Sequence, residues 1–501
     1  MKGKQIRMEL KTKSIKYNFI MNIILTVSSL IFPLITFPYI TRVLLPEGTG
    51  RIAFANSVVS YFSMFSMLGI PTYGIRACAK VRDDRDELIR TVQEIWIINV
   101  ITTIIVCIIF VLAVLNVQIL RQDLFLMLIC GLAIILNMFG MEWLYKGLES
   151  YSYITIRSVL FKAVGTLFMF LMVHKRSDYL IYAIIAVLAN SGYGILNFIH
   201  ACPYIFGKSI KKYNFKRHFK PTIIFFAMSV AVVIYTNLDI VMLGILKDSN
   251  EVGYYDIAVK IKVILVNIVT ALGAVVLPRV SYYIEKKRWE EFYNIISKAF
   301  ELVAVISIPL MVYFIVMAKS SILVLAGNEY LSAVPAMKLV MPTLVLIGFS
   351  NLLGIQILIP MGKEMVVVRS EVIGAVINVI MNLLLIPKLG ASGAAIGTLM
   401  AESAVLFVQY MYLKDVVKAS CKAIEIKKVL AGMLISIVAL TIVKSLNIAG
   451  PFVELLMTAF VFFTSYGVTL IISKEPLVVM TLKTVTQKLK NRRNSADDPK
   501  V

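Results

Sequence analysis

Residues 123–174 read DLFLMLICGLAIILNMFGMEWLYKGLESYSYITIRSVLFKAVGTLFMFLMVH. Two apolar runs, near 123–145 and 157–174, flank a short polar hinge that is rich in tyrosine. A helix needs roughly 20 mostly apolar residues to cross about 30 Å of hydrocarbon, and each run comes close to that length. The stretch therefore predicts two membrane-spanning helices joined by a turn.

The same pattern extends over the whole chain. Of its 501 residues, 59% are hydrophobic and 16% are charged, with a mean hydropathy of +0.84, whereas soluble domains carry about 25% charged residues. We count about fourteen apolar runs of membrane-spanning length. They lie near 18–43, 52–70, 93–114, 123–145, 157–174, 179–206, 222–246, 254–278, 293–318, 334–358, 366–387, 393–413, 429–445 and 452–473. These runs rarely alternate as barrel strands do, so the predicted fold class is an all-α polytopic membrane protein.

A faint internal repeat suggests how these helices are grouped. A shift of 203 residues aligns Gly50 with Gly253 and Arg76 with Arg279, and it pairs spans that run in the same direction. Two six-helix lobes around a central cleft are a transporter architecture. We expect lobes at 1–206 and 221–416, a cytoplasmic linker at 207–220, two extra helices within 417–473 and a basic tail at 474–501.

The basic residues predict the orientation in the membrane. Most Lys and Arg side chains fall in the two tails and in the connections that share a side with them, which places both termini in the cytoplasm. The net charge of +22 thus reflects topology and contact with anionic membrane lipids. Nucleic-acid binding is not expected, because the basic runs flank spans and form no separate domain.

Several function classes lack the residues that they need. The five cysteines form no CxxC pair and the three histidines are far apart in sequence, so neither a disulfide framework nor a metal site is expected. No connection is long enough for a catalytic domain, no phosphate-binding GxxxxGK[ST] motif is present, and no cofactor is expected. The segment VRDDRDELIRTV (81–92) is interpreted as a short amphipathic helix at the interface.

Several stretches together resemble the bacterial oligosaccharide flippases of the multidrug/oligosaccharidyl-lipid/polysaccharide exporter superfamily. They are FPYITRVLLPEGTGRIAFANSVVSYF (37–62), LGIPTYGIRACAKVRDD (68–84), the hinge EWLYKGLESYSYITIRS (142–158), TNLDIVMLGILKDSNEVGYYDIAVKI (236–261), LIPMGKEM (358–365) and LLIPKLGASGAAIGTLMAE (384–402). The resemblance implies a multi-pass protein of the bacterial cytoplasmic membrane that moves an undecaprenyl-diphosphate-linked sugar repeat unit outward by alternating access. A small-molecule antiporter of the same superfamily and a membrane-embedded enzyme are the alternatives.

A diphosphate cargo calls for cations, which are costly inside a membrane. The candidate substrate-binding residues are Arg42, Arg76, Lys162, Lys260, Lys262 and Lys338. Lys260 can pair with Asp256 one helical turn earlier, and Lys298 with Glu301. The alternative for all these cations is snorkelling or anchoring at the membrane interface.

Two carboxylates lie deeper in the predicted spans. Asp239 and Glu402 are candidate coupling sites for a proton or sodium ion, and the alternative is a structural hydrogen-bonding role. In the hinge, Trp143, Tyr145, Tyr151 and Tyr153 fit an interfacial aromatic belt as well as a stacking platform for sugars.

Overall fold

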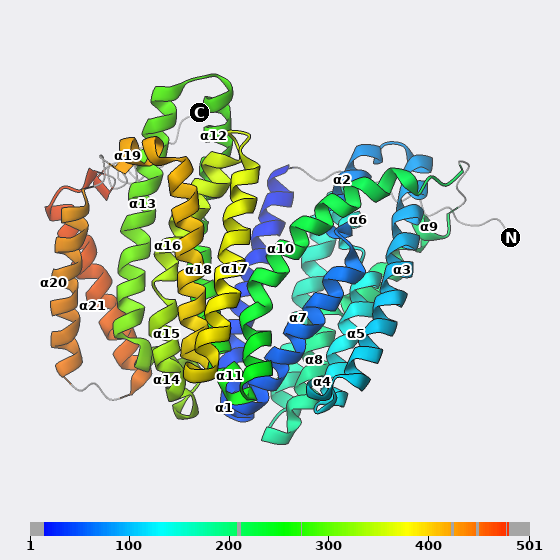
Figure 1. The fold of residues 1–501 in the computed structure, drawn as a ribbon, viewed down its shortest axis with the longest axis horizontal. Coiled ribbons are helices and arrows are strands. Elements are labelled where there is room, and N and C mark those ends of the chain that lie inside the picture. Colours follow the sequence, from blue (N-terminus) through cyan, green and yellow to red (C-terminus); the bar gives the residue numbers. More distant parts are fainter. Residues whose placement is uncertain are drawn as a thin grey trace, which may run out of the picture. The chain divides into compact units, whose positions relative to one another are not determined.

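The computed structural model describes residues 15–207, 212–271, 273–421, 425–446, 450–476 and 478–479. Every regular element in these ranges is a helix, which confirms the predicted all-α class (Figure 1). Contacts divide the chain into two compact units, and the boundary along the sequence lies between Gly253 and Tyr254. The N-terminal tail to residue 14, residues 208–211 of the predicted linker and residues 480–501 of the predicted basic tail lie outside the described residues.

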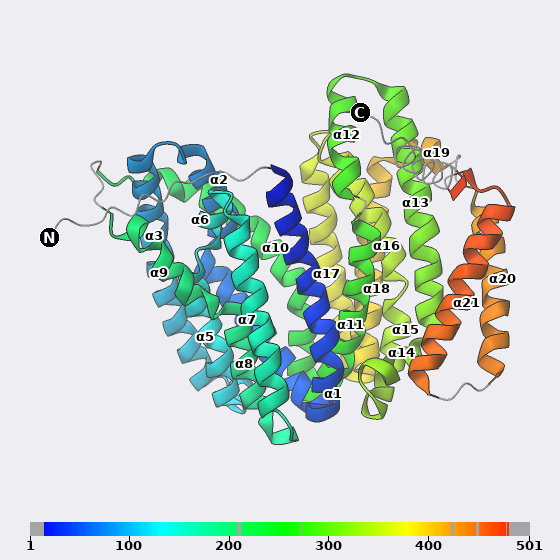
Figure 2. The same ribbon diagram turned by 180° about the vertical axis from the view of Figure 1, so that it is seen from behind.

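The N-terminal unit contains the helices up to α10 and the first residues of α11. Their bounds are α1 (Ile15–Met67), α2 (Ile70–Val81), α3 (Arg85–Asn116), α4 (Gln118–Arg121), α5 (Leu124–Gly140), α6 (Glu142–Gly147), α7 (Tyr151–Met172), η1 (Arg176–Asp178), α8 (Tyr179–Ser191), α9 (Tyr193–Ile205), α10 (Lys216–Leu246) and α11 (Ser249–Thr270). Within this unit α1 packs on α3, α5, α7 and α10. The α1, α7 and α8 helices are seen side by side in Figure 2.

The C-terminal unit holds the rest of α11 and the helices after it. They are α12 (Gly273–Glu285), α13 (Trp289–Val316), α14 (Ala318–Leu325), η2 (Asn328–Ala333), α15 (Val334–Val340), α16 (Thr343–Asn351), η3 (Leu352–Leu358), α17 (Glu364–Leu389), α18 (Ala391–Tyr412), α19 (Lys414–Cys421), α20 (Ile426–Ser445) and α21 (Pro451–Ile472). Helix α17 pairs with α18, and α20 pairs with α21. The lobe, linker and tail boundaries drawn from the sequence stay predictions.

Ten helical stretches of the described chain are long and apolar enough to cross a membrane, or twelve if each of two bent helix pairs is one span. The first stretch includes α1, whose 53 residues would measure about 80 Å, more than twice the hydrocarbon thickness. Helix α1 is broken at Leu45 (φ 60°, ψ 179°), just before Pro46, so its two arms suit separate crossings. The predicted count of fourteen is therefore approximate.

The hinge at 142–158 is a packing element. Trp143 and Tyr145 are buried, so the predictions of an interfacial belt and of a sugar platform are both wrong for these two residues. Helix α6 packs against α2, where a Cβ on Gly74 would lie 2.8 Å from the Trp143 ring. The Tyr145 hydroxyl donates to the Asn197 carbonyl at 2.6 Å.

Two turns in the N-terminal unit make a reciprocal close contact. A Cβ on Gly50 would lie 1.7 Å from the Ser249 carbonyl oxygen, and a Cβ on Gly253 would lie 2.3 Å from the Pro46 carbonyl oxygen. The repeat that pairs Gly50 with Gly253 also pairs Pro46 with Ser249. Gly50 approaches Ser249, and Gly253 approaches Pro46, so the two contacts are related by the same repeat. Segments related by two-fold symmetry make reciprocal contacts of this kind.

We expect Gly50→Ala to destabilise the protein, because the added methyl group must push the α10–α11 turn away, at a cost of about 1–3 kcal/mol for an overpacked contact. Gly467→Ala in α21 is the matched control, since no atom lies within 4 Å of its added Cβ. Thermal unfolding of the two purified variants measures the difference. Equal midpoints for both variants would contradict the close contact.

Candidate functional site

A cavity of about 510 Å³ opens inside the N-terminal unit. It is walled by α1, α5, α8 and α10 and by the turn between α1 and α2. Its polar lining consists of amides and hydroxyls: Asn56, Ser60, Ser63, Asn137, Asn190, Ser191 and Ser229. No charged side chain belongs to the described lining. The volume of this uncharged, hydrogen-bonding cavity lies within the ~300–1,000 Å³ typical of small-ligand pockets.

The sequence of α1 explains one wall of this cavity. Asn56, Ser60, Ser63 and Met67 follow one another at intervals of four, three and four residues, which places them on one face of a helix. This stripe carries no charged side chain, and its residues were therefore not among the predicted site residues. A polar stripe of helical period within an apolar run was the signal that could have revealed the site.

The cavity groups are partly satisfied by the protein. Ser60 Oγ donates to Asn56 O (2.7 Å), Ser229 Oγ to Phe225 O (3.0 Å), Asn190 Nδ2 to Ala186 O (2.9 Å) and Ser191 Oγ to Asn137 Oδ1 (3.0 Å). A hydroxyl that donates one bond keeps its two acceptor lone pairs, and an amide keeps further capacity. The wall therefore suits a neutral ligand with many hydroxyl groups.

The break between α1 and α2 shapes one end of the cavity. Leu68 and Gly69 both have positive φ (44° and 73°), which places Gly69 at the start of α2. A Cβ on Gly69 would lie 2.4 Å from the Phe226 amide nitrogen, so only glycine allows α10 to approach this closely. Asn99 Nδ2 (3.0 Å) and Thr102 Oγ1 (2.7 Å) both donate to the Ser66 carbonyl next to the break.

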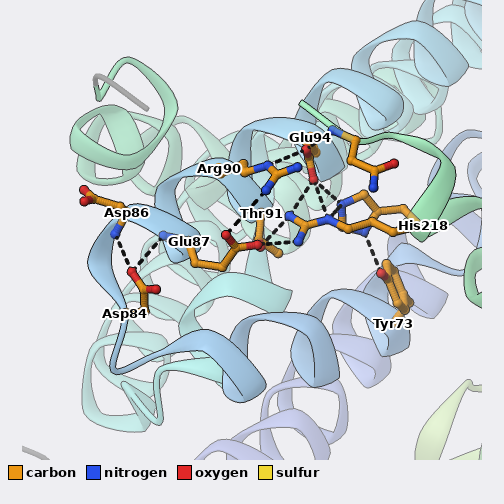
Figure 3. A network of polar contacts seen from close by, with 10 residues as sticks. Tyr73, Asp84, Asp86, Glu87, Arg90, Thr91, Glu94 and His218 are labelled. Atoms are coloured by element: carbon orange, nitrogen blue, oxygen red, sulfur yellow. Dashed lines mark hydrogen bonds and ion pairs between the residues drawn. The ribbon is translucent and has the colours of Figure 1, made fainter. Parts of the chain in front are cut away.

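A buried charge network lies at the start of α3 and of α10 (Figure 3). The Glu94 side chain is fully buried and accepts hydrogen bonds from Arg90 Nε at 3.0 Å and Arg217 Nε at 2.8 Å. His218 Nε2 lies 2.6 Å from the same carboxylate, and the His218 Nδ1 atom contacts the Tyr73 hydroxyl. These contacts join the beginning of α10 to α2 and α3. Their loss would be costly, because it would leave the buried Glu94 carboxylate without partners.

The start of α3 differs from the prediction made for segment 81–92. Asp84 caps α3, accepting from the backbone N–H groups of Asp86 and Glu87 at 3.1 Å each. The segment 81–92 therefore joins the end of α2 to the first turns of the long helix α3, and the prediction of a separate interfacial helix is wrong.

None of the predicted cations lines the cavity. Arg42 is exposed and donates from Nη1 to the Pro38 carbonyl at 2.6 Å, while Arg76 is exposed on α2. Lys162 is half-buried, and its Nζ donates to Ser29 Oγ at 2.8 Å. The N-terminal unit thus brings no pair of these cations together around the cavity.

The remaining cations belong to the C-terminal unit. The predicted ion pair between Lys260 and Asp256 is confirmed, with Nζ 2.6 Å from the carboxylate. Lys262 is half-buried and takes part in a polar contact, and Lys338 is exposed on α15. Whether these lysines bind cargo stays a prediction.

The two predicted coupling carboxylates are buried, with Asp239 7% and Glu402 5% exposed. Each takes part in a polar or electrostatic contact, and Asp239 interacts with the Tyr61 side chain. Neither carboxylate is therefore an isolated buried acid. Their role in coupling stays a prediction.

Arg157, near the end of the hinge and in the second turn of α7, is a further buried cation that was not among the predicted site residues. It is only 4% exposed, and its guanidinium lies 3.2 Å from Glu142 Oε1 and 4.0 Å from the ring centre of Tyr193. Charge pairing and cation–π contact stabilise the buried guanidinium, although its Nε and Nη1 atoms have no hydrogen-bond partner among the described residues.

Comparison with known proteins gives the family. Residues 15–284, more than half of the chain, match the family described as "Polysaccharide biosynthesis protein". The chain belongs to this family. Residues 224–384 also match the MatE family. The resemblance drawn from the sequence is confirmed at this level.

Members of this family and proteins of similar fold carry transporter names. The chain is 22% identical over 405 residues to a putative O-antigen transporter of Escherichia coli (strain K12), covering 80% of this chain and 97% of the relative. It is 27% identical over 241 residues to the probable flippase AglR of Haloferax volcanii, covering 47% and 50%. Among solved structures it resembles the lipid II flippase MurJ in an inward closed conformation, with a TM-score of 0.71, 14% identity and coverage of 92% and 100%.

We expect Asn190→Leu to weaken transport roughly two- to tenfold, because it removes one hydrogen-bonding group of about 0.5–1.5 kcal/mol from the cavity wall. Asn116→Leu is the matched control: its amide also bonds the carbonyl four residues earlier, at 2.7 Å, but it does not line the cavity. Transport is compared at equal protein abundance. Equal losses in both variants would show that the cavity does not contact the substrate.

Proposed function

We propose that the protein is a flippase that moves undecaprenyl-diphosphate-linked oligosaccharide repeat units from the cytoplasmic to the outer leaflet by alternating access, for surface polysaccharide synthesis. The observation that carries the proposal is the uncharged cavity lined by amides and hydroxyls within an apolar helical bundle. Sugar hydroxyls need such groups once they leave water, since an unsatisfied polar group in hydrocarbon is costly.

The comparisons support a transported lipid-linked substrate. The relatives include proteins named O-antigen transporters and a probable low-salt glycan biosynthesis flippase, and the MurJ structure is named as a lipid II flippase. Their names point to transporters and not to enzymes. The proposed location is the bacterial cytoplasmic membrane, with both termini in the cytoplasm.

The diphosphate requires cations in addition to the neutral cavity. Our candidates are the six cations predicted from the sequence, Arg42, Arg76, Lys162, Lys260, Lys262 and Lys338. Arginine and lysine bind phosphate oxygens through charge-assisted hydrogen bonds, which are stronger than those between neutral groups. Each of these six side chains lies on a helix.

The second candidate is a small-molecule antiporter, which a structural likeness to a multidrug transporter favours (TM-score 0.54, 13% identity). A cationic drug would need a carboxylate in its binding pocket. None of the described residues that line the cavity is acidic, so the cavity favours a neutral saccharide over a cation.

Deleting the gene should leave lipid-linked repeat units in the inner leaflet, because their synthesis continues while export stops. Extraction of lipid-linked sugars, together with staining of surface polysaccharide, measures both effects. Complementation with the unaltered gene is the control. Unchanged lipid-linked pools together with increased sensitivity to cationic dyes would instead indicate the antiporter.

We further propose that Asp239 and Glu402 bind a coupling proton or sodium ion, since both carboxylates are buried in helices α10 and α18. Asp239→Asn and Glu402→Gln should leave protein abundance unchanged and abolish the response of transport to an imposed ion gradient. The assay uses vesicles with a defined proton or sodium gradient. Full gradient dependence in both variants would exclude these residues from coupling.

A further inference from the structure

Two carboxyl groups meet inside the C-terminal unit, where α13 packs against the α20–α21 pair. Glu301 lies in α13, and Glu475 follows the end of α21. They are 7% and 1% exposed, and their carboxyl groups lie next to each other. Helices α20 and α21 stand beside α13 in both views of the fold (Figures 1 and 2).

Only some of the carboxyl oxygens of Glu301 and Glu475 accept a hydrogen bond from the described residues. The Val478 N–H donates to Glu475 Oε2 at 2.7 Å, which fixes the orientation of that carboxyl group. Glu475 Oε1 and Glu301 Oε1 are both buried and have no hydrogen-bond partner among the described residues. An ionised carboxylate only accepts hydrogen bonds, so two such groups in contact lack a donor between them.

The surrounding charges do not supply that donor. Lys298 acts on Glu301 electrostatically but is exposed, and the structure gives no ion pair between them, so the predicted pairing is wrong. Lys428 pairs with Glu425 and also donates to the Lys474 carbonyl at 3.1 Å.

Two other groups near the pair, Glu425 and Tyr466, also provide no hydrogen-bond donor to it. Glu425 adds a further negative charge near Glu301. The Tyr466 hydroxyl donates to the Val305 carbonyl at 3.2 Å and is therefore engaged elsewhere. Among the described residues, no cation forms an ion pair with either of the two buried carboxyl groups.

We propose that Glu301 and Glu475 form a proton-binding site in which one shared proton joins the two carboxyl groups and fastens the end of α21 to α13. Two carboxylates in contact cannot both stay ionised at low cost, and one proton turns their repulsion into a hydrogen bond. The site is independent of the transported cargo and of the proposed coupling residues Asp239 and Glu402.

A proton fits this site better than a metal ion. A metal ion bound between the two groups would require additional ligands, and no group of three or more His, Cys, Asp or Glu side chains in the described part of the chain is placed to hold a metal ion. Only a proton satisfies two facing carboxyl oxygens without further partners.

The pair makes the packing of the C-terminal helices depend on pH. A group that holds its proton more strongly in the folded than in the unfolded state contributes stability at acidic pH, and this stability is lost as the pH rises. The unfolding midpoint of the purified full-length protein should therefore fall by a few degrees from mildly acidic to mildly alkaline pH.

Glu301→Gln and Glu475→Gln test this directly, because the amide N–H of glutamine is a permanent donor to the remaining carboxylate. Both variants should lose the pH dependence of the unfolding midpoint. Glu290→Gln, at an exposed position near the start of α13, is the control and should keep the wild-type dependence. Glutamine variants that retain the wild-type dependence would overturn the proposal.

Infrared spectroscopy identifies the ligand itself, even if one variant folds poorly. The wild-type protein at neutral pH should show the carbonyl band of a protonated carboxyl group, and this band should be absent from either glutamine variant. Thermal unfolding in sodium chloride and in choline chloride of equal concentration separates a proton from a metal ion. Stabilisation by sodium alone, or absence of the carboxyl band, would overturn the assignment of a proton.

Discussion

The cost of placing a polar group in hydrocarbon governs this molecule. Backbone amides in a membrane must bond within their own segment, which leaves helices as the regular elements throughout the described chain. Side chains obey the same limit: the outward faces of the long helices carry exposed Ile, Leu, Val and Phe residues, and polar side chains turn inward. Any polar group inside the bundle therefore needs a partner, a cavity or a proton.

The structure meets this need in three ways. Glu94 is paired with Arg90 one helical turn away and with Arg217 from a distant part of the sequence, and it lies within hydrogen-bond distance of His218. The amides and hydroxyls around the N-terminal cavity bond partly to helix carbonyls and leave acceptors facing open space. Glu301 and Glu475 each keep one buried oxygen without a hydrogen-bond partner among the described residues, which is why they call for a proton. The first solution builds rigidity, the second leaves room for a ligand, and the third responds to pH.

Packing at single positions is as important as charge. Gly50 and Gly253 let two turns of the N-terminal unit touch through their backbones, and Gly69 does the same for α10 at the edge of the cavity. The faint repeat in the sequence acquires a physical basis here, because its paired residues occupy reciprocal places in one contact. A side chain at any of these positions would separate elements that form or support the cavity.

The sequence by itself determined the membrane location, the helical class and the short-range pair of Lys260 with Asp256, because each depends on composition, on apolar run length or on neighbours one helical turn apart. Its resemblance to known sequences indicated the family. Only the tertiary structure decided the rest. It buried Trp143 under α2, joined Glu94 to His218 from 124 residues away, and replaced the expected partner of Glu301, Lys298, with Glu475. Such contacts depend on which helix faces meet, and the periodicity of one helix does not specify the face of another that lies against it.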